Sequence, residues 1–388
     1  MDNNYSLDLS SLSKELRLLL EILRTEEFDS IGLVKKELYL DIDWEGFLQL
    51  AWHHRVYPFI YYKLKKADDN RIPPYVIQTL YKEFKKNTLQ MLHLSGEMEQ
   101  VSELFTENQI RLLYLKGPVI ATDIYGDISL RTSKDLDILI SITDLKRAEE
   151  LLLSIGYEKE VVPNVLNEWK WKSHHVVYLH PQKNIQIEIH WRLQPIPMKE
   201  PKFNELWERK RVSTLTSYPV YFLGIEDLLL YLISHGARHG WFRLRWLLDI
   251  HEMVRKGLEL EDINPIISKY QNRKLVGQAL ILTSGLLKTQ MNGGWKKLTE
   301  RNDSKKIAQN AIDFIKGTES LLTIMSSKHY KDYSLKLMSY LQRFFSFLIL
   351  FYPTSAELMT LRLPQPFHLL YFPLRPFLWV WRRIRQTS

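Results

Sequence analysis

The chain has 388 residues, of which 45% are hydrophobic and 25% are charged, and these proportions exclude fibrous, collagen-like and wholly disordered proteins. It contains no cysteine, which excludes disulfide frameworks, thiolate zinc sites and a cysteine nucleophile. The formal net charge of +8 favours anionic partners such as nucleotides, nucleic acid or a membrane surface, although a chain of this length reaches that excess by ordinary scatter.

The location in the cell is predicted from two further features. The first residues, 1–11, are polar and lack the basic and apolar regions of a secretory signal. The apolar run 344–352 is too short to cross a bilayer, which takes about 20 residues. Together with the absence of cysteine, these features predict a cytoplasmic protein.

The first hundred residues predict helices. Leucines in segment 12–23 recur at helical spacing and form one apolar stripe. Asp43 is a plausible N-cap for a second helix, and Pro58 lies near the start of a third. After Pro73 and Pro74 a long amphipathic run extends to about residue 107. Residues 1–108 are therefore expected to form an N-terminal helical region.

The pattern changes near Gln109 to short apolar runs that are separated by turn residues. The expected elements are, in chain order, strand 110–115, helix 119–125, a strand in the second half of 130–141, helix 143–155, and a hairpin of strands 176–179 and 185–191. Residues 109–225 are expected to form the catalytic core.

From Glu226 the sequence is mostly helical to about Phe351, and residues 226–388 are expected to form a C-terminal helical region. The final segment, 367–385, is aromatic and ends in arginines. Its prolines argue against one continuous helix, so packing against the helical region is expected, with contact to a membrane surface as the alternative. The predicted fold class is α+β, a small mixed sheet flanked by helical regions on both sides.

Acidic residues on two of the expected strands carry the most chemical information. Side chains alternate along a strand, so Asp135 and Asp137 share one face, and Glu188 shares a face with Gln186 and His190. If the strands are neighbours, three carboxylates converge, and they repel one another unless a cation neutralises them. Oxygen ligands suit Mg²⁺ or Mn²⁺. The alternative is an acidic strand end exposed to solvent, since Asp-x-Asp alone is common.

Several of these segments together resemble the uncharacterised nucleotidyltransferase family of the polymerase-β-like superfamily. The resemblance is carried by Leu115-Lys-Gly-Pro118, Tyr125-Gly-Asp127, Leu130-Arg131, Asp135-Leu-Asp-Ile-Leu-Ile140 and Ile187-Glu-Ile-His-Trp191. It extends over roughly residues 40–260, and more weakly into the tail.

The resemblance implies roles for the acidic residues and for the turn before them. Asp135 and Asp137 would be the paired metal ligands, and Glu188 the third carboxylate, which orients or deprotonates an acceptor hydroxyl. Lys116 and Gly117 occupy the place of the Gly-Ser turn that holds nucleotide phosphates in most of the superfamily. Lys116 would supply a positive charge there, and Gly117 would let the backbone approach closely.

Other polar residues have two interpretations each. Arg131 and Ser133 would contact a phosphate, or else form a salt bridge and cap a loop. His190 would support Glu188, or else be structural. His235 and His239 have zinc-compatible spacing but lack the companions of a zinc site; with Arg243 they would contact substrate, or else pack at an interface. Arg245 and Asp249 are expected to form a helix ion pair.

The expected activity is transfer of a nucleoside monophosphate from a nucleoside triphosphate to a hydroxyl or phosphate acceptor, with Mg²⁺ or Mn²⁺. The acceptor, whether small molecule, sugar, peptide or protein, stays open. The main alternative is a catalytically inactive nucleotide-binding or interaction protein on the same fold. A nucleic-acid-binding protein is the weaker rival because no nucleic-acid motif is present. A peripheral membrane enzyme is the third.

Overall fold

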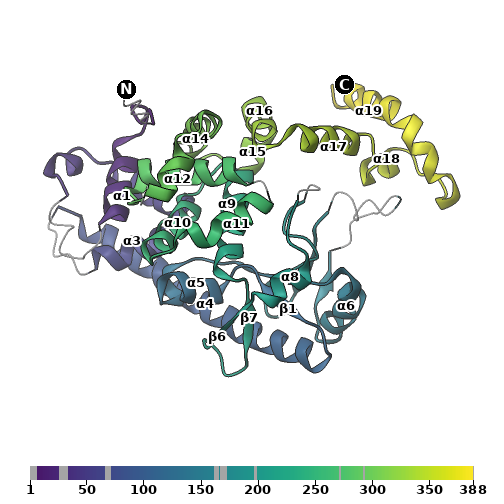
Figure 1. Cartoon of the computed structure of the whole chain (residues 1–388), viewed down its shortest axis with the longest axis horizontal. Coiled ribbons are helices and arrows are strands. Elements are labelled where there is room, and N and C mark those ends of the chain that lie inside the picture. Colours follow the sequence, from purple (N-terminus) through teal and green to yellow (C-terminus); the bar gives the residue numbers. More distant parts are fainter. Residues whose placement is uncertain are drawn as a thin grey trace.

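The computed structural model describes residues 7–25, 34–65, 71–160, 166, 173–195, 199–270, 272–291 and 293–387. Within these residues the fold is α+β, as predicted: a seven-stranded mixed sheet surrounded by helices. The N-terminal helices lie against green helices from the C-terminal half, and the last helices project to one side (Figure 1).

The N-terminal helices form where the apolar spacing predicted them. They are α1 (Lys14–Arg24), α2 (Trp44–His53), α3 (Tyr57–Leu64) and α4 (Pro74–Glu107), with the short 3₁₀ helix η2 (Lys36–Tyr39). Asp43 is the N-cap of α2, and its carboxylate accepts a hydrogen bond from the Glu45 amide at 3.1 Å. The leucines of α1 are buried on the predicted stripe.

The sheet has the strand order β3-β4-β5-β2-β1-β7-β6. The predicted strands appear as β1 (Leu112–Tyr114), β2 (Asp135–Ile140), β4 (His175–His180) and β5 (Ile185–His190). The edge strands β3 (Glu158–Lys159) and β6 (Arg211–Ser213), and β7 (Val220–Phe222) beside β6, were not predicted, because segments of two or three residues carry too little alternation to be recognised.

The central pairing of the sheet is parallel, between β2 and β5. Its register places Asp135 opposite Gln186, Asp137 opposite Glu188 and Leu139 opposite His190. Leu136, Ile138, Ile187 and Ile189 are fully buried, so the other side chains of both strands share the opposite face. This pairing confirms that the two acidic strands are neighbours.

Helices fill the connections and the C-terminal half. Between strands lie α5 (Pro118–Tyr125), η3 (Ile128–Leu130), η4 (Ile142–Asp144), α6 (Leu145–Ser154) and α8 (Phe203–Glu208). After β7 follow α9 (Ile225–Arg238), α10 (Leu244–Arg255), α11 (Leu260–Lys269), α12 (Arg273–Leu287), α13 (Gly293–Thr299), α14 (Asn302–Ile315), α15 (Leu321–Ser326), α16 (Lys328–Leu337) and α17 (Tyr340–Leu350). The division at residues 108 and 225 stays a prediction.

The last segment differs from its prediction. After α17 the chain forms α18 (Ser355–Thr360), the 3₁₀ helix η5 (Gln365–Leu370) and the unbroken helix α19 (Tyr371–Thr387). Pro373 is accommodated because its missing amide falls in the first turn, where that group has no helical partner, and Pro376 lies inside the helix. The large apolar side chains here are exposed, so the expected packing against the helical region is wrong. Among the described residues, no helix is long and apolar enough to cross a membrane.

His54 joins the N-terminal helices to α10. Its ring Nδ1 accepts the Leu244 amide at 3.3 Å, and its carbonyl oxygen accepts the Arg245 amide at 3.3 Å. The imidazole is fully buried, and burial together with neighbouring His53 lowers the pKa of His54 to about 3.

We expect His54 to make the protein less stable in acid. Below pH 6.5, the ordinary pKa of histidine, His54 binds a proton in the unfolded chain but stays neutral in the folded chain. The free energy of unfolding therefore falls as the pH is lowered from 6.5 to about 3. By pH 5 the loss is about 2 kcal/mol. In urea unfolding, His54→Asn, which keeps an acceptor for the Leu244 amide, should lose about 2 kcal/mol less than the parent between pH 7.5 and about pH 5. Equal losses in the two proteins would contradict this.

Candidate active site

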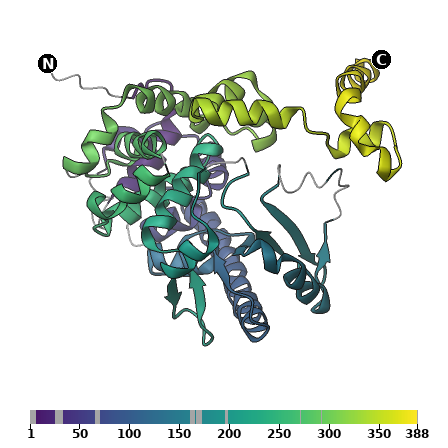
Figure 2. The same ribbon diagram turned by 45° about the vertical axis from the view of Figure 1, so that its right-hand side comes forward.

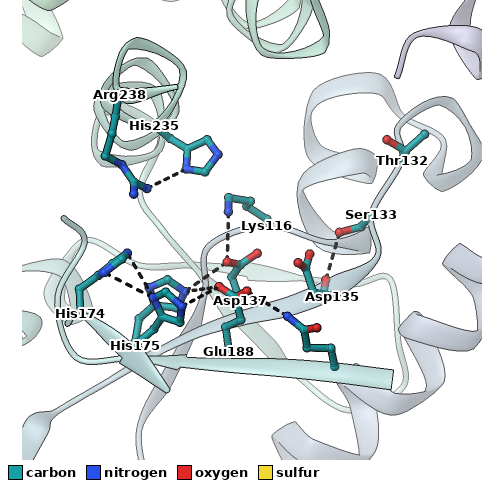
Figure 3. A network of polar contacts seen from close by, with 12 residues as sticks. Lys116, Thr132, Ser133, Asp135, Asp137, His174, His175, Glu188, His235 and Arg238 are labelled. Carbon is teal, nitrogen blue, oxygen red and sulfur yellow. Dashed lines mark hydrogen bonds and ion pairs between the residues drawn. The ribbon is translucent and has the colours of Figure 1, made fainter. Parts of the chain in front are cut away.

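Strands β2 and β5 carry the three predicted carboxylates into one site. Asp137 and Glu188 are directly opposed in the register, and Asp135 lies two residues before Asp137 on the same face (Figure 3). One ligand atom each of Asp137, Glu188 and His190 lie within 4.8 Å of one another. The structure therefore brings together the predicted acidic residues.

Asp137 is the most buried of the three acids, with 0% exposure. Its Oδ1 accepts from Lys116 Nζ at 3.1 Å and lies 3.2 Å from His190 Nε2. Burial acts to raise the pKa of Asp137, but Lys116 and His190 outweigh it and hold that pKa far below its ordinary value. Asp137 is therefore ionised at neutral pH. Its second oxygen, Oδ2, is buried and has no hydrogen-bond partner among the described residues.

Asp135 has a different electrostatic environment. Burial, and then the negative charge of Asp137, raise the pKa of Asp135 to about 6. Ser133, which the sequence assigned to a phosphate or to a loop cap, donates from Oγ to the Asp135 carbonyl oxygen at 3.0 Å. The two aspartates thus differ in proton affinity although they are two residues apart.

Glu188 is held by polar side chains on its own strand. Its carboxylate accepts from Gln186 Nε2 at 3.0 Å and lies 3.4 Å from His190 Nε2. Burial acts to raise the pKa of Glu188, but the His190 contact outweighs it, and the pKa is lowered. Conversely, the two carboxylates overcome burial and raise the pKa of His190. His190 therefore bridges Asp137 and Glu188.

Two further imidazoles were missed from the sequence. His174 and His175 lie at the start of β4, which pairs antiparallel with β5 so that His175 is opposite His190. One ring nitrogen each of His174, His175 and His190 lie within 4.8 Å of one another. Burial and the neighbouring His190 lower the pKa of His175 to about 4, so its ring is neutral. The two adjacent histidines just before the predicted hairpin are the sequence feature that could have indicated this cluster.

The Lys-Gly turn lies between β1 and α5. Gly117 has φ +94°, a conformation that disfavours side chains, and it is the N-cap of α5. The preceding Lys116 extends from the end of β1 toward Asp137, beneath α9 (Figure 3). The predicted positive charge of Lys116 therefore lies beside the carboxylates.

A cavity of about 320 Å³ opens over these carboxylates. A second cavity of about 680 Å³ adjoins it and shares Arg55, Ser133 and Arg243 as lining residues. The smaller cavity is also lined by Arg238 and Arg245, and by His235 and His239, which the sequence left between substrate contact and packing. The Nε atoms of three of these arginines are buried without a hydrogen-bond partner among the described residues: Arg238, Arg243 and Arg245.

The chain matches one family of known proteins. The profile of a family described as uncharacterised nucleotidyltransferases matches residues 41–288, which is more than half of the chain. The chain belongs to this family. No curated protein matches it.

A solved structure similar to this nucleotidyltransferase family member is that of an antigenic nucleotidyltransferase-like protein from Paracoccidioides brasiliensis. The sequences are 14% identical, and the match covers 52% of this chain and 94% of that chain with a TM-score of 0.29.

Arg131 forms a salt bridge, which was one of its two predicted interpretations. Its side chain is 1% exposed, and its Nε and Nη2 donate to the Asp249 carboxylate at 3.0 Å each. The expected helix pair between Arg245 and Asp249 is wrong, because Asp249 is taken by Arg131 and by the Tyr125 hydroxyl at 2.8 Å. Arg245 instead donates to Thr132 Oγ1 at 3.0 Å. In this family member these contacts hold the loop that leads into β2.

We expect Asp249→Ala to lower the free energy of unfolding by about 3–5 kcal/mol, because it leaves the Arg131 charge buried without its partner. Urea unfolding followed by circular dichroism measures this loss. The control is Glu83→Ala, which removes an exposed partner of Lys86 and should cost under about 1 kcal/mol. A loss for Asp249→Ala as small as that of the control would show that the pair does not hold the loop.

Proposed function

We propose that the protein is a cytoplasmic nucleotidyltransferase that transfers a nucleoside monophosphate from a nucleoside triphosphate to a hydroxyl or phosphate acceptor. The observation that carries this proposal is the parallel pairing of β2 with β5, which places Asp135, Asp137 and Glu188 under a cavity lined by basic side chains. Family membership supports the same class of activity.

The carboxylates fit a divalent cation. Asp137 Oδ2 is buried and lacks a hydrogen-bond partner among the described residues, so it is available as a ligand. The ligand atoms of Asp137, Glu188 and His190 are close enough to share one ion, and Asp135 would complete the oxygen set. Carboxylate oxygens suit Mg²⁺ or Mn²⁺. When bound, such ions neutralise charge on the phosphates and activate the attacking oxygen.

The basic residues of the cavity suit a triphosphate. Burial, and then the charges of Arg131 and Arg55, lower the pKa of Arg245 to about 9. These cations repel one another, and an anionic ligand between them relieves that repulsion. Lys116, Arg238 and Arg243 add further positive charge around the same volume. We infer that this cluster binds the phosphates and orients the α-phosphorus.

Glu188 has the role of orienting the acceptor. Both acids line the cavity, but the Glu188 side chain is 19% exposed, whereas Asp137 is fully buried. In the proposed reaction the acceptor oxygen attacks the α-phosphorus, its bond to phosphorus forms as the bond to pyrophosphate breaks, and Glu188 takes the acceptor proton. The adjoining cavity is large enough for a small acceptor or for one residue of a peptide.

We expect Asp137→Asn to abolish transfer of label from α-³²P nucleoside triphosphates, because removing one interaction made in the transition state costs about a hundredfold or more in rate. All four triphosphates should be tested with Mg²⁺ and with Mn²⁺ against candidate acceptors. Asp332→Asn, on an exposed position of α16, is the matched control and should label normally.

Two outcomes would contradict the assignment. Equal labelling by Asp137→Asn and the parent would remove the acidic site. A thermal shift with a triphosphate and Mg²⁺, combined with no transfer to any acceptor, would instead support the inactive nucleotide-binding alternative.

We expect Arg243→Ala to raise KM for the nucleoside triphosphate by about tenfold to a hundredfold, because one charge-assisted hydrogen bond contributes about 1.5–3 kcal/mol. Steady-state kinetics at fixed Mg²⁺ measure the change. Arg362→Ala, in the exposed segment after α18, is the control and should leave KM unchanged. An unchanged KM for Arg243→Ala would place the phosphates elsewhere in the cavity.

A further inference from the structure

The C-terminal arm, defined here as residues 340–387, extends from the rest of the molecule, which it contacts through α16 and through a hydrogen bond from the Tyr352 hydroxyl to the Leu166 carbonyl oxygen. It comprises α17, α18, η5 and α19. Both views show it projecting beyond α16, away from the helices around the N-terminus (Figures 1 and 2). Helices α18 and α19 pack on each other. The arm is therefore a folded extension with its own internal contacts.

The distribution of polar and apolar side chains in the arm is inverted relative to a protein surface in water. Tyr340 is 89% exposed and Phe377 is 73% exposed, whereas Glu357 is fully buried. The other exposed large apolar side chains of the arm include Leu341, Phe344, Phe347, Leu350, Met359, Phe367, Leu369, Phe372, Trp379, Trp381 and Ile384. Isolated exposed apolar residues are ordinary, but this many in one segment mark a surface that something covers.

Helix α17 has its polar side toward the rest of the protein. Arg343 Nε donates to the Leu335 carbonyl oxygen at 2.8 Å, and Ser346 Oγ contacts Met338 Sδ at 3.4 Å. Gln342, Arg343 and Ser346 are half-buried and share one side of the helix, whereas Phe344, Phe347 and other apolar residues face outward. The apolar face of α17 is thus directed away from the protein.

Several polar groups of α18 and α19 bind one another in the interior of the arm. The Glu357 carboxylate accepts from the Thr354 amide at 2.7 Å and from Arg382 Nη2 at 2.7 Å. The fully buried Tyr371 donates to the Leu361 carbonyl oxygen at 2.6 Å. These contacts fix the arm in one shape in which the apolar side chains point outward.

The arm is also strongly basic. Residues 340–387 contain six arginines and one glutamate, so they carry +5 of the net charge of +8. Arg383 lies over the ring of Trp379 at 4.4 Å, and Arg385 over that of Trp381 at 5.2 Å. Paired tryptophan and arginine suit the boundary between headgroups and acyl chains, where one group is apolar and the other meets anionic phosphates.

We propose that the C-terminal arm binds the surface of a lipid bilayer that carries anionic headgroups, with its aromatic and aliphatic side chains in the interfacial layer. The arm lies on the membrane rather than crossing it, since none of the described helices is long and apolar enough to span. A second copy of the chain fits this surface less well, because symmetric contact would set one arginine-rich arm against another. Anionic lipid instead complements the charge.

The test is co-sedimentation of the full chain with vesicles of phosphatidylcholine, with and without phosphatidylglycerol. We expect binding that requires phosphatidylglycerol and weakens as salt is raised. Trp379→Ala with Trp381→Ala, and separately Arg383→Glu with Arg385→Glu, should each lower vesicle affinity by about tenfold or more. These substitutions spare Arg382 and Glu357, so the arm keeps its shape, which circular dichroism checks.

The matched control is Leu89→Ala with Leu92→Ala, which removes two exposed apolar side chains from α4 and should leave vesicle binding unchanged. Two results would overturn the proposal. One is vesicle binding that is absent, or equal in the arm variants and the parent. The other is a dimer in light scattering that becomes a monomer in the arm variants, which would make a second copy the occupant. Neither result depends on nucleotidyl transfer.

Discussion

The charge balance around the Asp137 carboxylate is the constraint on which the site depends. A fully buried carboxylate is costly unless positive or hydrogen-bonding partners compensate it. Lys116 and His190 provide that compensation from β1 and β5, on both sides of β2. The sheet order β5-β2-β1 is therefore also an electrostatic arrangement, and a change in strand order would leave Asp137 buried without partners. One oxygen of Asp137 has no hydrogen-bond partner among the described residues, and it is the ligand atom of the proposed metal site.

The loop before β2 is held as firmly as the strands. Asn87 on α4 donates to the Ser129 carbonyl oxygen at 2.8 Å, and Asp249 on α10 binds Arg131. Helices that precede and follow the strands in the sequence thus fix the approach to Asp135. Buried ion pairs stabilise little relative to apolar packing, but they are costly to break singly, which makes them effective at fixing one arrangement. The helical regions consequently determine where the acidic strand begins.

Positive charge has two separate uses in the molecule. In the cavity, burial and then the charges of neighbouring arginines lower the pKa of Arg245, and a phosphate-bearing ligand would relieve that repulsion. In the C-terminal arm, arginines lie at the surface among exposed aromatic rings. The first arrangement suits a small anion that is enclosed, and the second suits an extended anionic surface. If both proposals hold, the enzyme works beside a membrane with its cavity on the folded core.

The sequence by itself determined the α+β class, most of the helices, the central strands and the acidic residues, because these depend on local periodicity and capping. Alternation along each strand placed Asp135 with Asp137, and Glu188 with Gln186 and His190. Only the tertiary structure shows which segments meet: β2 and β5 are parallel neighbours, Arg131 binds Asp249, and His174 and His175 lie beside His190. Each of these depends on contacts between segments distant in the chain. The exposure of the apolar side chains in the C-terminal arm could not be predicted either, because local periodicity does not show whether another segment of the chain covers them.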